Sequence, residues 1–143
     1  MTDESISNKT NCIFCKIVRG EVPAEKVYED KDTLAFLDIR PNNVGHTLVV
    51  PKEHYENTYS TPDNVLCAVI KTAKKVAVAV KKGTGADGIN ITNNNDSPAG
   101  QLIFHTHFHI VPRFTDDGFK HWPGKEVRED TLKEAAEKIR KSL

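Results

Sequence analysis

The chain has 143 residues and a mass of 16.0 kDa, which is enough for one ordinary domain with a core of its own. Its 20 lysines and arginines balance 20 aspartates and glutamates, so it lacks the basic excess of a general nucleic-acid or membrane binder. Apolar runs such as residues 76–80 are far shorter than the roughly 20 residues of a membrane-spanning helix.

The first part of the chain is expected to be a disordered leader followed by a short helix. Residues 1–11 are polar and have no apolar stretch of the kind that export signals carry, so a cytoplasmic location is expected. Residues 12–19 carry apolar side chains at helical spacing, and Gly20 ends the pattern. Two of the three cysteines form the pair Cys12-x-x-Cys15, which indicates a metal or redox site more than a structural disulfide.

Three stretches with β character and one long helix follow. The strands are expected at residues 26–29, 33–39 and 46–50. Residues 61–82 place apolar side chains on one helical face and lysines on the other. Thr61 is expected to cap this helix, Gly83 to end it, and Cys67 to be a small core residue.

The last part of the chain is expected to contain two strands and a helix. Residues 88–92 and 102–111 have strand character and are joined by a polar loop at residues 93–100. The final helix is expected to begin at Thr131, where Thr131 and Glu134 match a capping box. Five strands with helices between them predict an α+β domain on a mostly antiparallel sheet.

Three of the six histidines fall within five residues, at His105, His107 and His109. Alternate side chains of a strand share a face, so the three are expected to project together, opposite a packing face of Phe104, Thr106, Phe108 and Ile110. In one interpretation they bind a single metal ion, although outer positions about 13–14 Å apart fit poorly with metal–nitrogen bonds of about 2.0–2.1 Å. In the other, the middle imidazole is a nucleophile that attacks phosphorus and then leaves.

The run at residues 105–111 resembles the His-x-His-x-His-x-x pattern of the histidine triad (HIT) family of nucleotide hydrolases and transferases. The resemblance covers roughly residues 11–113, and it continues in the family's order through residues 11–17, 35–39, 45–52 and 100–101. The cysteine pair is similar to that of the zinc-containing sub-branch with Hint-type hydrolases.

The resemblance implies a single domain over residues 12–143, with a C-terminal loop and helix. Its five-stranded sheet would pair with a second copy into ten strands in a homodimer. His107 would attack the α-phosphorus of a nucleotide and become transiently nucleotidylated, with His46, His105 and His109 beside it. The implied substrate-binding residues are Ile13, Phe14, Ile17, Leu37, Asp38 (on the ribose hydroxyls), Ile39, Asn94, Gly100 and Gln101.

The same sub-branch implies a structural zinc ion held by Cys12, Cys15, His54 and His105, and no organic cofactor. This arrangement would leave His107 without a metal. One position departs from the pattern, because Leu102 stands where many relatives carry Ser or Thr near the phosphate.

The function that the resemblance implies is cleavage at the α-phosphorus of an AMP-type nucleotide conjugate, with nucleoside phosphoramidates as the first substrate class. Two alternatives stay open. A dinucleoside polyphosphate hydrolase is favoured by residues 110–113, and a non-catalytic nucleotide-binding regulator is suggested by Leu102. A metal-storage module would need histidines beyond the triad, such as His121. Neither nucleic acid nor a membrane is an expected partner.

Overall fold

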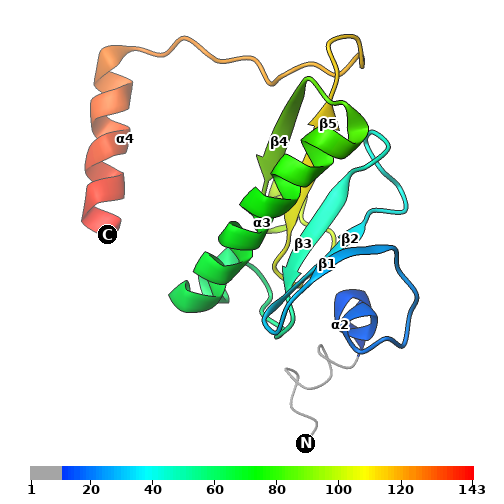
Figure 1. The fold of residues 1–143 in the computed structure, drawn as a ribbon. Helices are drawn as coiled ribbons and strands as arrows, with labels where there is room; N and C mark the ends of the chain where they lie inside the picture. The colour runs from blue at the N-terminus through cyan, green and yellow to red at the C-terminus, as the bar shows by residue number, and fades with distance from the viewer. Residues whose placement is uncertain (1–10) are drawn as a thin grey trace, which may run out of the picture.

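The computed structural model describes residues 11–143, so positions 1–10 of the expected leader lie outside the described residues. Its five strands form one sheet in the order β1-β2-β3-β5-β4, and all neighbouring strands are antiparallel (Figure 1). This architecture confirms the expected α+β fold. The strands are β1 (Lys26–Glu29), β2 (Thr33–Leu37), β3 (Thr47–Pro51), β4 (Gly88–Thr92) and β5 (Phe108–Arg113). The helices are α2 (Ile13–Val18), η1 (Thr58–Ser60), α3 (Asp63–Thr84), η2 (Ser97–Ala99) and α4 (Glu129–Ser142).

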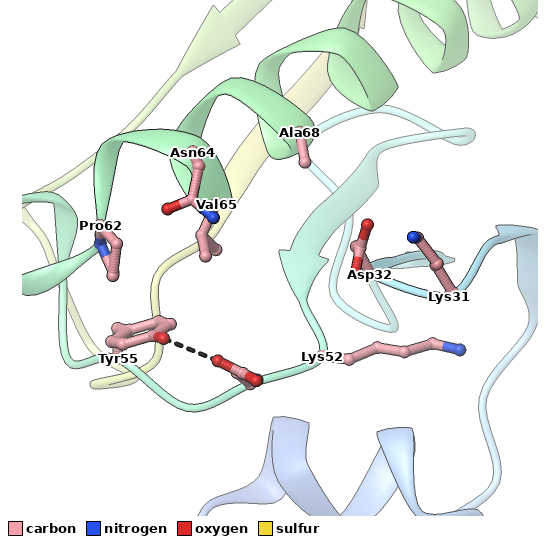
Figure 2. A pocket seen from close by; sticks show the side chains of 9 residues that line it. Lys31, Asp32, Lys52, Tyr55, Pro62, Asn64, Val65 and Ala68 are labelled. Carbon is pink, nitrogen blue, oxygen red and sulfur yellow. Dashed lines mark hydrogen bonds between the residues drawn. The ribbon is translucent and has the colours of Figure 1, made fainter.

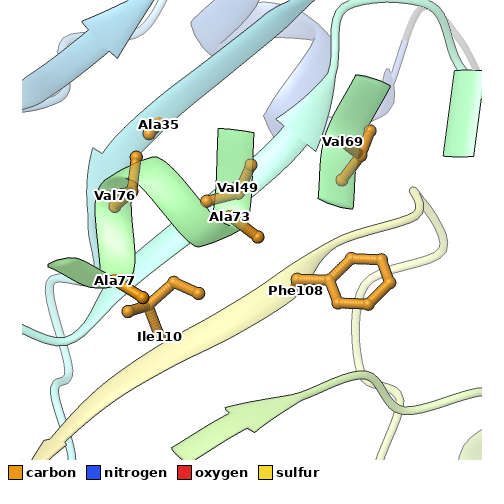
Figure 3. Close-up of a cluster of buried hydrophobic side chains, with 8 residues drawn as sticks. All are labelled: Ala35, Val49, Val69, Ala73, Val76, Ala77, Phe108 and Ile110. Atoms are coloured by element: carbon orange, nitrogen blue, oxygen red, sulfur yellow. The ribbon is translucent and has the colours of Figure 1, made fainter. Parts of the chain in front are cut away.

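Both faces of the sheet carry a hydrophobic core, because alternate side chains of β2 and β3 are buried on opposite sides. Helix α3 covers one face, where the cluster in Figure 3 contains Ala35, Val49, Val69, Ala73, Val76, Ala77, Phe108 and Ile110. Helix α2 covers part of the other face, where the cluster contains Phe14, Ile17, Leu34, Phe36, Leu48 and Val50. The sheet residues of this second cluster come from β2 and β3.

Strand register places His109 on the face that α2 covers. His109 pairs with Leu48 of β3 on one side and with Thr92 of β4 on the other. Paired residues of antiparallel strands point to the same face. His109 therefore lies beside the α2 cluster, at the boundary with the part of the sheet formed by β4 and β5.

The expectation of a strand over residues 102–111 is wrong, because β5 begins only at Phe108. The residues before Phe108 do not pair with a neighbouring strand, because they form hydrogen bonds with other parts of the chain. The backbone N–H of Thr106 donates to the carbonyl of Tyr55 at 2.8 Å, and its hydroxyl lies 2.7 Å from that of Thr61. The packing face predicted for this stretch also fails at Phe104, which is exposed.

Helix α3 differs from expectation at both ends. It begins at Asp63 after Pro62, and the hydroxyl of Thr61 donates to the carbonyl of Asn57 at 2.7 Å, so Thr61 does not cap the helix. The helix continues past Gly83 to Thr84 and is capped by Gly85, which has a φ of 72°. Cys67 is exposed and not in the core, because it lies about 200° around the helix from buried Val69.

The last helix stands apart from the sheet at the end of an extended segment (Figure 1). Helix α4 begins at Glu129, two residues before the expected start, and it has no side-chain cap, so the capping box predicted at Thr131 and Glu134 is wrong. The carboxylate of Asp130 accepts the N–H of Thr131 instead. No residue of α4 is buried. Among residues 11–143, no helix is both long enough and apolar enough to cross a membrane.

Candidate active site

Three of the predicted histidines meet where β3 and β5 lie side by side. His46 immediately precedes β3, His107 immediately precedes β5 and His109 lies within it. The ring centroids of His107 and His109 are 4.9 Å apart, and those of His46 and His109 are 5.2 Å apart. Asp38 follows β2 and brings a carboxylate oxygen to 3.8 Å from Nε2 of His46. The structure thus gathers residues from three different parts of the sequence.

The hydrogen bond of His107 determines which of its nitrogens carries the proton. Nδ1 lies 2.7 Å from the carbonyl oxygen of His105. A carbonyl can only accept, so Nδ1 of His107 is the protonated nitrogen. In the neutral ring, Nε2 then keeps its lone pair and is the nucleophilic atom.

The same reasoning assigns the protons of His46 and His109. The backbone N–H of Asn42 donates to Nδ1 of His46 at 3.1 Å, so Nε2 of His46 carries the proton. That proton is donated to Nδ1 of His109 over 3.0 Å. His109 consequently carries its own proton on Nε2, where it can be given to a ligand.

Burial keeps these imidazoles neutral. Loss of solvent lowers the pKa of His46 and of His107 below 6.5, and it outweighs the opposing effect of the Asp38 carboxylate. The pKa of His109 falls to about 4, first through burial and then through the neighbouring His107 and His46 rings. A neutral imidazole can act as a nucleophile or hydrogen-bond donor at neutral pH.

The cysteine pair meets two histidines in a second cluster, formed by Cys12, Cys15, His54 and His105. Nδ1 of His105 is 3.5 Å from each Sγ and 3.2 Å from Nδ1 of His54, and the Sγ of Cys15 is 3.3 Å from Nδ1 of His54. Tetrahedral zinc with ordinary bond lengths would separate such donors by about 3.3–3.8 Å. Nε2 of His105 donates to the carbonyl of Pro51 at 2.8 Å, which leaves Nδ1 available as a ligand. The four donors fit a zinc ion.

A third group of possible ligands, Asp38, His46 and His109, fits a metal less well. Coordination through Nε2 of His46 would require the ring proton to move to Nδ1. That position already receives the N–H of Asn42 at 3.1 Å. This group is therefore arranged for hydrogen bonding and proton transfer.

The predicted nucleoside cleft is divided between core and surface. Phe14 is buried and meets His107 edge-on, with ring centroids 5.1 Å apart, and Ile17 is buried beside it. Ile13 and Ile39 are exposed. Leu37 is half-buried, next to Asp38 at the end of β2. Ile13 and Ile39 therefore offer exposed apolar surface that a base could contact.

The residues predicted to contact phosphate lie in the loop between β4 and β5. Gln101 is buried, and its side chain accepts from the N–H of Asp96 at 2.8 Å and donates to the carbonyls of Glu56 and Ile103. These bonds favour a role in shaping the loop over direct contact with a substrate. Asn94 packs against Gly100, whose φ is 94°. Leu102 faces solvent with 87% of its surface exposed.

Asn93 is a residue of this site that sequence reasoning missed. Its Nδ2 donates to the carbonyl of His107 at 2.9 Å, while its Oδ1 accepts from the hydroxyl of Thr58 and from Nδ2 of Asn95. Asn93 thus holds the backbone of His107 against η1. The run of three asparagines was the available signal, but it did not distinguish the position that contacts the histidine.

A separate cavity of about 320 Å³ lies near the first turn of α3 (Figure 2). Its lining includes Lys31, Lys52 and the pair Tyr55 and Glu53, in which the phenol donates to the carboxylate at 2.7 Å. None of the histidines lines this cavity. The candidate chemistry therefore lies at the histidine cluster and not here.

A family model described as the HIT domain matches residues 19–116, which is more than half of the chain. The chain belongs to the HIT family. This finding confirms the resemblance seen in the sequence and identifies the chain as related to HIT nucleotide hydrolases and nucleotide-binding proteins.

HIT relatives cover much of this chain. A HIT-like protein of Methanocaldococcus jannaschii is 59% identical over 107 residues, which are 75% of this chain and 82% of the relative. The adenylylsulfatase HINT3 of Arabidopsis thaliana is 42% identical over 130 residues, covering 91% of this chain and 65% of its own. The adenosine 5′-monophosphoramidase of Schizosaccharomyces pombe is 37% identical over 132 residues, covering 90% and 96%.

Solved HIT structures share the fold. A crystal structure from Streptococcus mutans has a TM-score of 0.87 at 47% identity and covers 92% of this chain and 85% of that one. A structure described as a zinc-bound histidine triad family protein, from Mycobacterium smegmatis, has a TM-score of 0.75 at 36% identity and covers 94% and 99%.

Proposed function

We propose that this protein hydrolyses nucleotide conjugates at the α-phosphorus through a covalent nucleotidyl-histidine formed on His107. The observation that carries the proposal is the hydrogen bond from Nδ1 of His107 to the carbonyl of His105, at 2.7 Å. It directs the lone pair to Nε2 and stabilises the positive charge that develops on the ring when Nε2 bonds to phosphorus.

In the first step, Nε2 of His107 forms a bond to phosphorus, and the bond from phosphorus to the leaving group breaks. The leaving group takes the electron pair of that bond and a proton from Nε2 of His109. His46 holds His109 in the required tautomer through its 3.0 Å hydrogen bond. In the second step, water attacks phosphorus and gives a proton back to Nε2 of His109, while the bond from phosphorus to Nε2 of His107 breaks and returns its electron pair to that ring. The monophosphate then leaves, and both imidazoles are neutral again.

The proposed substrate carries an AMP-type nucleotidyl group. Asp38 would accept hydrogen bonds from the ribose hydroxyls, and Ile13 and Ile39 would contact the base beside Phe14. The names of two relatives, an adenosine 5′-monophosphoramidase and an adenylylsulfatase, support adenosine and the α-phosphorus as the shared part of the substrate. Adenosine 5′-phosphoramidate is therefore the first substrate to test.

We also propose that Cys12, Cys15, His54 and His105 hold one structural zinc ion per chain. Their spacing fits tetrahedral coordination, and the zinc-bound relative from Mycobacterium smegmatis supports the assignment. The ion would attach α2 to the segment before β5 and would leave His107 free to react. We further propose that the HIT domain over residues 12–143 forms a cytoplasmic homodimer, since the edge strands β1 and β4 each offer a place for a second sheet.

The decisive experiment compares wild type with His107→Ala, using adenosine 5′-phosphoramidate as substrate. Turnover should fall by about 1,000-fold or more in the variant, since the covalent route is lost. Rapid acid-free quenching of wild type should trap one nucleotide per active site on the protein. His121→Ala is the matched control, because His121 is an exposed histidine that should leave turnover unchanged. Near-normal turnover by His107→Ala, with its circular dichroism intact, would refute the mechanism.

A further inference from the structure

The loop that leads into β3, residues 40–46, controls the ring of His46. Within this loop, the N–H of Asn42 donates to Nδ1 of His46 at 3.1 Å, and the carbonyl of Asn43 accepts the backbone N–H of His46 at 3.0 Å. Gly45 gives the loop a tight turn with a φ of 102°, and a Cβ there would lie 2.6 Å from a side-chain atom at the end of α3. The placement of this loop therefore decides whether the Asn42 N–H reaches the His46 ring.

The side chain of Asn43 attaches the loop to β5. The ladder between β3 and β5 ends two residues before Pro112. Beyond the ladder, Nδ2 of Asn43 donates to the carbonyl of Pro112 at 2.8 Å and to the carboxylate of Asp117 at 3.1 Å. A side-chain amide has two N–H groups, so it can make both bonds at once. His109 lies on the same strand, three residues before Pro112, so the loop and His109 share one support.

Asp117 is itself held by several donors. The guanidinium of Arg113 donates to its two carboxylate oxygens at 2.7 and 3.1 Å, and the backbone N–H groups of Phe114 and Phe119 each donate at 3.0 Å. Only 6% of the Asp117 side-chain surface is exposed. Arg113, followed by the two backbone N–H groups, holds the pKa of the Asp117 carboxyl well below its usual range. Asn43 is therefore bonded to a fixed anion at neutral pH.

The tautomers of His46 and His109 are coupled. One proton lies in the 3.0 Å bond between Nε2 of His46 and Nδ1 of His109. While the Asn42 N–H occupies Nδ1 of His46, this proton belongs to His46, and His109 keeps its own proton on Nε2. Without that N–H, His46 could hold its proton on Nδ1, and the proton between the rings would belong to His109. Nε2 of His109 would then carry a lone pair and could not protonate a leaving group.

We propose that Asn43 is a positioning residue for the proton donor of the reaction and that Asp117 anchors it. The inference rests on the proposed function, since His109 is the proposed proton donor. By fixing the loop to β5, Asn43 keeps the Asn42 N–H at His46 and thereby keeps the proton on Nε2 of His109. The segment that follows β5 thus supports the chemistry through Asp117.

The kinetic test compares two AMP conjugates that differ in whether the leaving group needs a proton. Adenosine 5′-phosphoramidate releases an amine that must be protonated, whereas the para-nitrophenyl ester of AMP releases a phenolate that is stable as an anion. In Asn43→Ala, kcat/KM should fall by about 10- to 100-fold for the phosphoramidate and stay within about threefold for the ester, because only the first reaction needs the general acid. Loss of AMP binding or of folded protein would lower both values equally.

Two further variants separate the hydrogen bonds of Asn43 from its shape and surroundings. Asn43→Asp keeps the shape but loses both donors, so it should change the ratio of the two kcat/KM values as Asn43→Ala does. Asp87→Asn is the matched control, because Asp87 accepts from the N–H and hydroxyl of Thr115 at 2.8 and 3.1 Å. It thus holds the same C-terminal segment through a different contact, and its ratio should equal that of wild type.

Nitrogen NMR of the histidine rings measures the tautomers without any turnover. In wild type, His46 and His109 should both carry their proton on Nε2. In Asn43→Ala and Asn43→Asp, a fraction of His46 should carry its proton on Nδ1, and the same fraction of His109 should do so. Circular dichroism checks that each variant is folded.

The outcomes separate the role of Asn43 from the proposed function. The positioning role is supported only if the ratio and the tautomers both change in the two Asn43 variants. An unchanged ratio, equal losses on both substrates or unchanged tautomers would overturn it and leave the proposed function in place. Turnover of neither conjugate by folded wild type would overturn the proposed function, while the NMR result would still decide whether Asn43 sets the tautomers.

Discussion

At the residue scale, the reactivity of this HIT protein depends on which ring nitrogens are protonated. Main-chain groups determine which ring nitrogen carries the proton in His46 and in His107. The N–H of Asn42 fixes the tautomer of His46, and the carbonyl of His105 fixes that of His107. His109 receives its tautomer from His46. Fixed backbone geometry would therefore prepare the proposed nucleophile and the proposed proton donor before any substrate binds.

The lowered pKa values predict an unusual dependence of rate on pH. An exposed histidine would lose activity near pH 6.5, whereas burial lowers the pKa of His109 to about 4. Burial also lowers the pKa of His107, the proposed nucleophile, so the acid-side fall of kcat/KM in the free enzyme should lie below pH 6.5. A half-maximal point at pH 6.5 in the kcat/KM profile would contradict this prediction.

The same shift affects stability with a definite sign. An unfolded chain takes up a proton on His109 near pH 6.5, whereas the folded chain resists protonation until about pH 4. The free energy of unfolding should therefore decrease as the pH falls through this interval. Urea titrations at pH 7, 6 and 5 measure the decrease, and equal midpoints at all three pH values would rule out the burial effect.

Asn93→Ala should slow the reaction without weakening substrate binding. Asn93 touches the carbonyl of His107 and not the proposed substrate, so its loss would let the nucleophile shift. We expect kcat to fall by about 10- to 100-fold with KM unchanged within about twofold. Asn64→Ala, at an exposed position in the first turn of α3, is the matched control. An equal rise in KM would assign Asn93 to substrate binding instead.

The sequence named candidate residues that the structure brings together, but it did not predict their geometry. His46, Asp38 and His109 could be named from the resemblance, and they lie together. The picture of three histidines alternating along one strand is wrong, because His105 and His107 precede β5. Bonds from distant residues, such as Tyr55 to Thr106, redirect this segment, and a short-range pattern does not contain them.

At the scale of elements, α2 is too short to be stable alone, with six residues against the roughly 12 that an isolated helix needs. Helix α2 is held to the sheet by its hydrophobic cluster around Phe14 and Ile17. Its cysteines also lie beside His54 and His105. Proposed zinc at that point would contribute to folding stability.

Removal of the metal should consequently destabilise the protein. Purified protein should contain about one zinc per chain by elemental analysis, and a strong chelator should lower Tm as the zinc is removed. Cys15→Ser should show the same lower Tm without chelator, whereas Cys67→Ser, an exposed cysteine on α3, should behave as wild type. Metal-free protein with both Cys12 and Cys15 titratable would end the zinc assignment.

The core between β5 and α3 offers a direct test of packing. Ile110 is fully buried on the α3 side, and its register partner Ile91 of β4 is about half exposed. Ile110→Ala should lower the free energy of unfolding by about 2–5 kcal/mol in urea titrations. Ile91→Ala should lower it by about 1 kcal/mol or less, which makes it a control with the same chemistry. Similar losses would show that burial does not distinguish the two sites.

Element boundaries show where local patterns suffice. The apolar face of α3, with Val69, Ala73 and Val76, was predictable because helical periodicity alone specifies it. Its first residue was not, because the hydroxyl of Thr61 bonds to Asn57 and not to the helix. Caps compete with tertiary hydrogen bonds, and a sequence does not reveal which will form.

At the scale of the whole molecule, the sheet with its two packed helices and the C-terminal helix α4 differ in how much of their surface is buried. The sheet with α2 and α3 has a core on each face. Helix α4 stands apart from the sheet (Figure 1). It has no buried residue, and its Leu132 and Ile139 are exposed. A single helix of 14 residues is marginal in water, so α4 should be less protected than the sheet.

Limited proteolysis should therefore cut first in the extended segment at residues 118–128. The expected products are a released C-terminal peptide and a stable body whose Tm stays within a few degrees of that of the intact chain. Size-exclusion chromatography with light scattering, before and after cleavage, also reports whether α4 takes part in the proposed homodimer. Cleavage within β2 or β3 before this segment would contradict the difference between the regions.

One residue, His105, links the cysteine cluster to the candidate active site. The carbonyl that orients His107 belongs to His105, whose own ring completes the cysteine cluster. A shift in the cysteine cluster would therefore also move the carbonyl that orients His107. Damage to the two thiols, for instance by an oxidant, should first appear as slower chemistry, while the sheet and its long helix still hold their shape.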